Sequence, residues 1–147
     1  MLHTRRFLLP VFVLCTLVFA GCGGGTKGPT IKGTVVLPSN VKLNKDDSAT
    51  LVFLPDGEGG KEFAAPINAS DLTFSAVGPL GKGVTPGNYK ITVKLQPYAP
   101  GNSPERKAFD QLNTKYSSGS SKLTYKVTEE SVQSIAVDLN AGTVTKK

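Results

Sequence analysis

The segment from Tyr89 to Gln96 alternates strictly between large apolar and polar side chains. Its odd-numbered positions hold a tyrosine and three aliphatic residues, and its even-numbered positions hold lysine, threonine or glutamine. A period of two is that of an extended strand with one face in a core and the other in water. Because a single strand cannot bury such a face alone, the segment predicts a β-sheet packed on a hydrophobic core.

Shorter runs of similar character recur along the chain, separated by glycine and proline. The turn at 85–88 contains Pro86, which fixes φ, and Gly87, which adopts positive φ without steric cost. Many short strands punctuated in this way favour a sandwich or barrel. The sequence therefore predicts an all-β domain, a β-sandwich of about seven strands, at residues 30–37, 49–54, 61–69, 71–77, 89–96, 122–128 and 135–139.

The connection at 97–121 is longer than a hairpin needs, and its middle part has helical signals. Ser103 can cap a helix whose first residue is Pro104, and Glu105 falls in the first turn, where the helix dipole favours negative charge. Phe109 and Leu112 are three residues apart and so share one side of such a helix. We predict one short helix in this crossover loop, packed on the sandwich. A plain connection and a functional loop both remain open.

The N-terminal segment has the pattern of an export signal. Arg5 and Arg6 precede residues 7–20, which carry no charge. A helix that spans a bilayer needs about 20 apolar residues, so this run is short for a permanent anchor. A basic start followed by a short apolar stretch and small residues is typical of a secretory signal peptide.

The end of that segment, Phe19-Ala20-Gly21-Cys22, resembles the bacterial lipobox. The resemblance implies that Cys22 receives a diacylglycerol and that cleavage occurs just before it. Cys15 would be removed with the signal, which leaves one cysteine that cannot form an internal disulfide and that acylation would explain. The alternative is an ordinary signal peptide, with Cys22 left as a free thiol.

These features predict four segments. They are a lipoprotein signal peptide (1–21), the lipidated Cys22 with a glycine-rich tether (22–29), a β-sandwich domain (30–141) and a C-terminal tail (142–147). The expected location is extracytoplasmic, anchored through the lipid on Cys22 to the periplasmic face of a bacterial membrane or to the cell surface.

Several pieces of the predicted domain are similar to the carboxypeptidase regulatory-like domain. They are Gly33-x-Val35, Ala49-x-Leu51-x-Phe53, the stretch from Gly83 through Pro86-Gly87-Asn88-Tyr89 to Val93, and Ile135-x-Val137-x-Leu139. The chain as a whole resembles small lipoproteins with this domain that are common in planctomycete-like bacteria. The resemblance implies a transthyretin-like or immunoglobulin-like Greek-key β-sandwich and an anchored accessory role. It departs at Asp71–Phe74, where the family usually has a glycine before the aromatic residue.

The residue inventory excludes several kinds of chemistry. Without residues 1–21 the chain has no histidine, no tryptophan and no cysteine besides Cys22. A histidine-based triad, a Cys-His pair and a zinc site built on His or Cys are therefore excluded. We expect no enzyme activity, no cofactor and no metal site.

The charge distribution argues against nucleic-acid binding. Loss of Arg5 and Arg6 lowers the formal net charge from +6 to +4 and leaves Arg106 as the only arginine. The lysines are scattered along predicted strands, which is typical of a solvated sheet face. No nucleic-acid partner is expected.

Two functions remain open for the domain. The first is a structural or interaction module of the cell envelope, with an unknown protein partner. The alternative is a carbohydrate-binding module, which would need exposed aromatic platforms. Tyr98 and Tyr116 are the candidates for partner contact, because Tyr89 and Tyr125 fall in core register.

Overall fold

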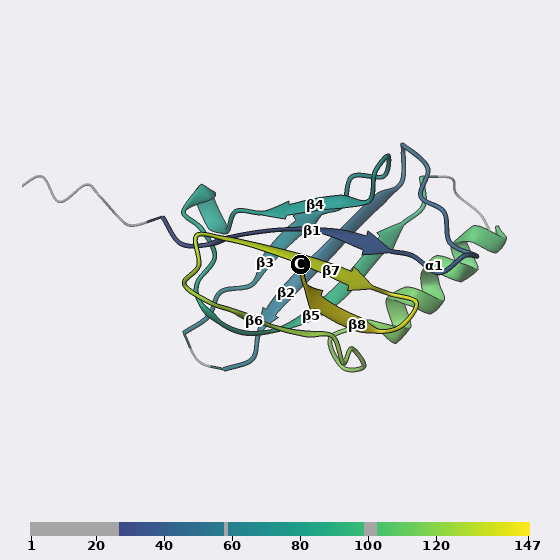
Figure 1. Ribbon diagram of the computed structural model, residues 1–147. Coiled ribbons are helices and arrows are strands. Elements are labelled where there is room, and N and C mark those ends of the chain that lie inside the picture. The colour runs from purple at the N-terminus through teal and green to yellow at the C-terminus, as the bar shows by residue number, and fades with distance from the viewer. Residues whose placement is uncertain (1–26, 58, 99–102) are drawn as a thin grey trace, which may run out of the picture.

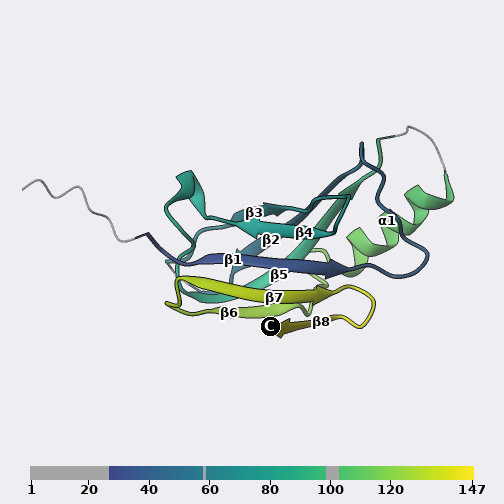
Figure 2. The ribbon, with the colours of Figure 1, turned by 45° about the horizontal axis from the view of Figure 1, so that its top comes forward.

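The computed structural model describes residues 27–57, 59–98 and 103–147. Within these ranges two four-stranded sheets enclose one hydrophobic core, and a single α-helix lies at one end of them (Figures 1 and 2). The strands are β1 (Thr30–Val36), β2 (Ser48–Pro55), β3 (Phe63–Pro66), β4 (Thr73–Ala76), β5 (Gly87–Gln96), β6 (Thr124–Val127), β7 (Val132–Asp138) and β8 (Thr143–Lys146). A 3-10 turn, η1 (Pro79–Gly81), precedes β5, and the helix α1 (Pro104–Lys115) follows it. The predicted all-β class is confirmed.

The strand orders are β4-β1-β7-β8 in one sheet and β3-β2-β5-β6 in the other. All neighbours are antiparallel except β1 and β7, which run parallel over the full length of β1. The first strand, β1, therefore lies between β4 and β7. The β1–β7 pair joins the two ends of the chain within one sheet.

The alternation in β5 positions the core as the sequence predicts. Tyr89, Ile91, Val93 and Leu95 are buried, and they belong to the same hydrophobic core as apolar residues of the opposite sheet such as Ile31 and Ile135. Around Tyr89 three rings pack together, with the Phe53 and Phe63 ring centroids 4.5 Å apart and Tyr89 edge-on to both. Offset and edge-to-face aromatic pairs of this kind stabilise a core beyond simple area burial.

The helix forms where its capping signals lie. The Ser103 hydroxyl accepts a hydrogen bond from the Arg106 N–H (3.2 Å), Pro104 is the first helical residue, and Glu105 lies in the first turn. Phe109 and Leu112 are buried, so the predicted helix and its packing side are confirmed.

Two differences from the sequence prediction concern the strands. The sheets hold eight strands and not about seven, and the extra one lies where we expected a tail at 142–147. β8 pairs with β7 from Ile135–Lys146 to Asp138–Thr143. An edge strand needs only backbone pairing on one side, so this segment forms one with few apolar residues, and Val144 supplies a partly buried contact.

Candidate functional site

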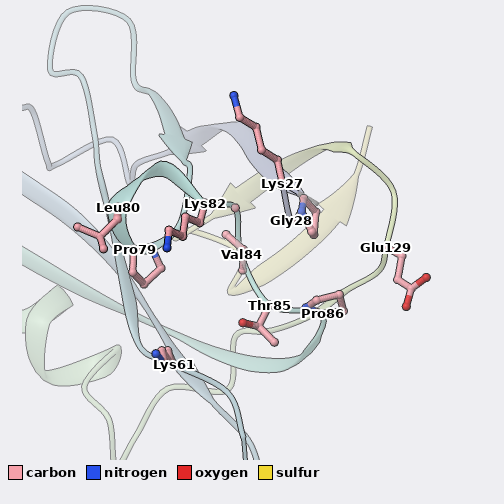
Figure 3. A pocket seen from close by; sticks show the side chains of 12 residues that line it. Lys27, Gly28, Lys61, Pro79, Leu80, Lys82, Val84, Thr85, Pro86 and Glu129 are labelled. Atoms are coloured by element: carbon pink, nitrogen blue, oxygen red, sulfur yellow. The ribbon is translucent and has the colours of Figure 1, made fainter. Parts of the chain in front are cut away.

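The end of the sandwich where the described chain begins is hollowed. A cavity of about 730 Å³ is lined there by the 27–29 segment, the loop from Pro79 to Pro86, Lys61 and Glu129 (Figure 3). We call this end, with its residues 27–29, 61, 78–86 and 129, the tether pole. In Figure 1 it lies opposite the end that carries α1.

Backbone hydrogen bonds fix the first described residues to this loop. The Gly28 N–H donates to the Lys82 carbonyl (2.8 Å), and the Val84 N–H donates to the Pro29 carbonyl (2.7 Å). Gly83 makes the close approach feasible, because its φ of +88° suits glycine and a Cβ at this position would collide with the Gly28 backbone. The point where the chain enters the domain is therefore held against the loop that contains η1.

Leu80 is the most exposed large apolar side chain among the described residues. It lies in η1 with 92% of its surface accessible and no neighbour that covers it. Its φ of +55° and ψ of 23° are in the left-handed region, which a branched side chain adopts only at an energetic cost. An apolar residue that is both exposed and strained at a loop tip has no role in the core of this domain.

The charges at the tether pole are mostly positive. Lys27, Lys61 and Lys82 come from three separate segments, and among the described residues Glu129 is the only acidic one that lines the cavity (Figure 3). Within the described ranges the single salt bridge joins Lys146 to Glu130 (2.7 Å), so none of these three lysines is in an ion pair there. Ammonium groups of one sign that line a hollow create a positive potential, which attracts anions or an anionic surface.

The turn that leads into β5 forms part of the cavity wall at the tether pole. The Tyr89 hydroxyl donates to the Thr85 carbonyl (2.8 Å) across Pro86 and Gly87. Burial raises the pKa of Tyr89 above its ordinary value, and the ring itself packs in the aromatic cluster. The proline-glycine-x-tyrosine sequence therefore fixes this turn rather than exposing its aromatic ring.

The two tyrosines predicted for partner contact have different positions. Tyr98 is 76% exposed, and its backbone N–H donates to Asp47 Oδ1 (2.9 Å). Tyr116 is only 3% exposed, and its hydroxyl donates to the Leu139 carbonyl (2.7 Å). The prediction that Tyr116 is an exposed platform is wrong, because the residue ends α1 and its ring packs in the core.

A second, larger hollow of about 900 Å³ lies along the outer face of the β3-β2-β5 sheet. Val52 and Thr92 face each other there across β2 and β5. Thr92 falls on the polar side of the alternation and was expected in water, but it is 5% exposed and its hydroxyl donates to the Val52 carbonyl (3.4 Å). This face has no charge pattern or neighbour that indicates an occupant.

Asn113 forms one wall of that hollow and completes the hydrogen bonding of β5. Its side-chain oxygen accepts from the Leu95 N–H (2.7 Å), and its side-chain nitrogen donates to the Leu95 carbonyl (2.9 Å). Next along β5, the Val93 N–H donates to the Tyr116 carbonyl (3.1 Å). The asparagine amide therefore acts as a substitute for a strand neighbour beyond the end of β6.

The predicted lipidation site, Cys22, lies outside the described residues. In the described ranges no group of three His, Cys, Asp or Glu side chains is close enough to hold a metal ion. No helix among the same residues is long and apolar enough to cross a membrane.

Sequence reasoning treated 78–83 only as a run of strand breakers and did not identify the tether pole. A single leucine between Pro79 and Gly81, followed by Lys82, is the signal that could have identified an exposed apolar tip. The pairing of Gly28 with Lys82 could not be inferred, because it joins segments more than fifty residues apart.

No family model, no curated protein and no solved structure matches this chain.

Proposed function

We propose that this chain is an extracytoplasmic lipoprotein whose β-sandwich is a non-catalytic structural or interaction module of the cell envelope. The observation that carries the proposal is the junction Phe19-Ala20-Gly21-Cys22 after a short apolar run with a basic start. Only seven residues separate Cys22 from Thr30, where β1 begins. A lipid on Cys22 would therefore hold the domain directly beside the membrane.

The finer identity of the fold belongs to the same proposal. We infer a transthyretin-like sandwich related to the carboxypeptidase regulatory-like domain. Two four-stranded sheets, the parallel β1–β7 pair and one helix in the crossover between β5 and β6 support this inference. The Pro86-Gly87-Asn88-Tyr89 turn entering β5 is the sequence element that supports it most directly.

The carbohydrate-binding alternative loses support. It relied on two exposed aromatic rings, and Tyr116 is buried, so among the described residues Tyr98 remains as the single candidate platform. We therefore favour the interaction module. Glycan-array binding that disappears in Tyr98→Ala would reverse this preference.

The anchor is tested by replacing its cysteine in the full chain, expressed in a bacterium with the lipoprotein export route. Cys22→Ser should move the protein from the membrane fraction to the soluble exported fraction and abolish its partitioning into detergent. Two or more acyl chains hold a protein stably on a bilayer, whereas none leaves only surface attraction.

Cys15→Ser is the matched control, because Cys15 lies within the apolar run and is expected to be removed with the signal. This variant should fractionate with membranes like the wild type. A Cys22→Ser protein that stays in the membrane fraction would refute the lipoprotein proposal and indicate an uncleaved apolar helix.

A further inference from the structure

We propose that the tether pole is a membrane-docking face, in which Leu80 enters the headgroup region of an anionic bilayer and Lys27, Lys61 and Lys82 contact its lipid phosphates. This inference rests on the proposed anchor at Cys22. It goes beyond the anchor because it gives the domain one fixed orientation on the membrane.

The first argument is reach. Lys27 follows Cys22 by five residues, and a chain spans at most about 3.5 Å per residue, so Lys27 stays within roughly 18 Å of the lipidated cysteine. A glycine-rich chain of this length has an average span nearer 12 Å. A lipid on Cys22 therefore keeps the first described residues of the domain close to the bilayer.

The second argument is that the loop carrying Leu80 shares this position. The two backbone hydrogen bonds from Gly28 and Pro29 to the 82–84 segment hold the loop against the chain entry. Gly28 itself adjoins Lys27, so the restraint from the anchor passes directly to the loop. Leu80 cannot be far from the membrane if Gly28 is near it.

The third argument is the chemistry of the face. Leu80 is an unshielded apolar side chain held in a strained conformation, and interfacial apolar side chains of peripheral proteins bury about 5–10 Å into the headgroup and acyl boundary. Val77, next to the same loop, is also exposed. Exposed apolar residues beside an anchor gain contact with lipid at no cost to the core.

The fourth argument is charge complementarity. In the described part of the chain the face holds three lysines and one glutamate, whereas α1 at the opposite end holds both signs close together, with Glu105 and Asp110 among its basic residues. Each lysine near an anionic leaflet strengthens association roughly fivefold. The tether pole therefore favours the membrane more than the opposite end does, and docking would point α1 and Tyr98 away from the bilayer.

The test uses the lipidated mature protein in vesicles of phosphatidylcholine and phosphatidylglycerol in equal parts. Cys22 is acylated at sulfur, so Leu80→Cys introduces the one free thiol for an environment-sensitive fluorophore. Tyr98→Cys is the matched control, because it is also exposed but follows the far end of β5. We expect a blue-shifted, lipid-quenchable emission at position 80 and a water-like emission at position 98.

A comparison of two triple variants with the same net charge tests the role of the lysines. Lys27→Gln, Lys61→Gln and Lys82→Gln in combination, with the label at position 80, should lower the ratio of docked to undocked label at least tenfold. Lys107→Gln, Lys115→Gln and Lys122→Gln in combination should leave it within about twofold, because these lysines lie outside the face.

The failures are distinguishable. If no variant floats with vesicles, the anchor itself is refuted, and the docking face with it. If the protein floats but position 80 remains as water-like as position 98, the docking face is refuted and the anchor stands. Shielding of position 80 that grows with protein density and ignores vesicle charge would mean that a second copy occupies the face, which also overturns the proposal.

Discussion

The two ends of this sandwich are finished in opposite ways. At the helix pole, which we define as α1 with Val41 and Leu139, apolar side chains close the core, and Phe109, Leu112 and Tyr116 are all buried. At the tether pole the backbone is tied together by hydrogen bonds, but Leu80 is exposed and the surface is hollowed. The apolar side chains of the helix pole are buried within the domain, whereas Leu80 at the tether pole is exposed to solvent.

The difference indicates which end contributes to the free energy of folding and which end is available for contact with another molecule or surface. Burial of large apolar side chains supplies most of the free energy of folding, so the helix pole should be sensitive to truncation of its side chains. Side chains that point into water at the tether pole contribute little to folding and are free to contact something else. Substitutions at the two poles can therefore separate folding from docking.

The largest effect is expected from Phe109→Ala at the helix pole. Phe109 is 1% exposed, and truncation of a buried phenylalanine costs about 3–5 kcal/mol, because contacts are lost and a cavity remains. Leu80→Ala at the tether pole should change the free energy of unfolding by less than about 0.5 kcal/mol. Urea unfolding of both variants measures the contrast, and similar losses would show that the poles do not differ as described.

Asn113→Ala should have the next largest effect. It leaves the Leu95 N–H and carbonyl without partners in a partly buried position, which costs about 2 kcal/mol. Thr114→Ala, at the exposed neighbour, should cost less than about 0.5 kcal/mol. Hydrogen exchange should report faster exchange at the Leu95 amide in Asn113→Ala only. Unchanged protection there would mean that the amide of Asn113 does not substitute for a strand.

Tyr89→Phe tests the hydrogen bond that holds the turn before β5 at the tether pole. Loss of the hydrogen bond to the Thr85 carbonyl should cost about 1 kcal/mol at neutral pH, while the aromatic packing is retained.

The same substitution has a pH dependence with a defined sign. Burial raises the pKa of Tyr89 above its unfolded value of 10.0, so the folded state holds this proton more tightly than the unfolded state does. The associated stability is complete below pH 10 and declines as the pH rises through the folded pKa. Tyr89→Phe should reduce this alkaline decline. The raised pKa of Tyr125 should leave part of it. An alkaline slope identical to the wild type would contradict this assignment.

The smallest effect is expected from Leu80→Asn, and it is stabilising. Asparagine tolerates the left-handed region better than leucine does, so relief of strain should add about 0.5 kcal/mol to the free energy of unfolding. Val77→Asn is the control, since Val77 is exposed nearby without a positive φ. A gain in stability with a loss of vesicle docking in the same variant would show that Leu80 is retained for contact. A variant that loses stability would mean that Leu80 has a folding role.

The helix pole could be predicted from sequence, because its determinants are local. Ser103, Pro104 and the spacing of Phe109 and Leu112 give the start and the buried side of α1 within twelve residues. Tyr116 escaped this reasoning because its burial depends on Leu139, twenty-three residues away, and on the end of the helix turning toward the core. At the helix pole, therefore, the local sequence pattern predicts the helix α1 but not the contact between Tyr116 and Leu139.

The tether pole could not be predicted, because non-local backbone pairing creates it. The run of breakers at 78–83 correctly predicted a loop, but its attachment to Gly28 has no sequence period or motif. β8 was missed for the same reason, since its pairing with β7 needs backbone groups and only one partly buried side chain. The alternation of side chains in a sequence predicts which face of a strand is buried. It does not predict which distant backbone segments form hydrogen bonds with each other.

The asparagine at the end of α1 has a consequence for proteins held close together on a membrane. β5 extends beyond β6, and an uncovered stretch of strand edge invites pairing with the strand of a neighbouring molecule. The Asn113 amide pairs with the N–H and the carbonyl of Leu95, and the Tyr116 carbonyl accepts from the Val93 N–H. If Cys22 carries the proposed lipid, the protein is confined to two dimensions and locally concentrated, and the helix then protects it from joining edge to edge into intermolecular sheets.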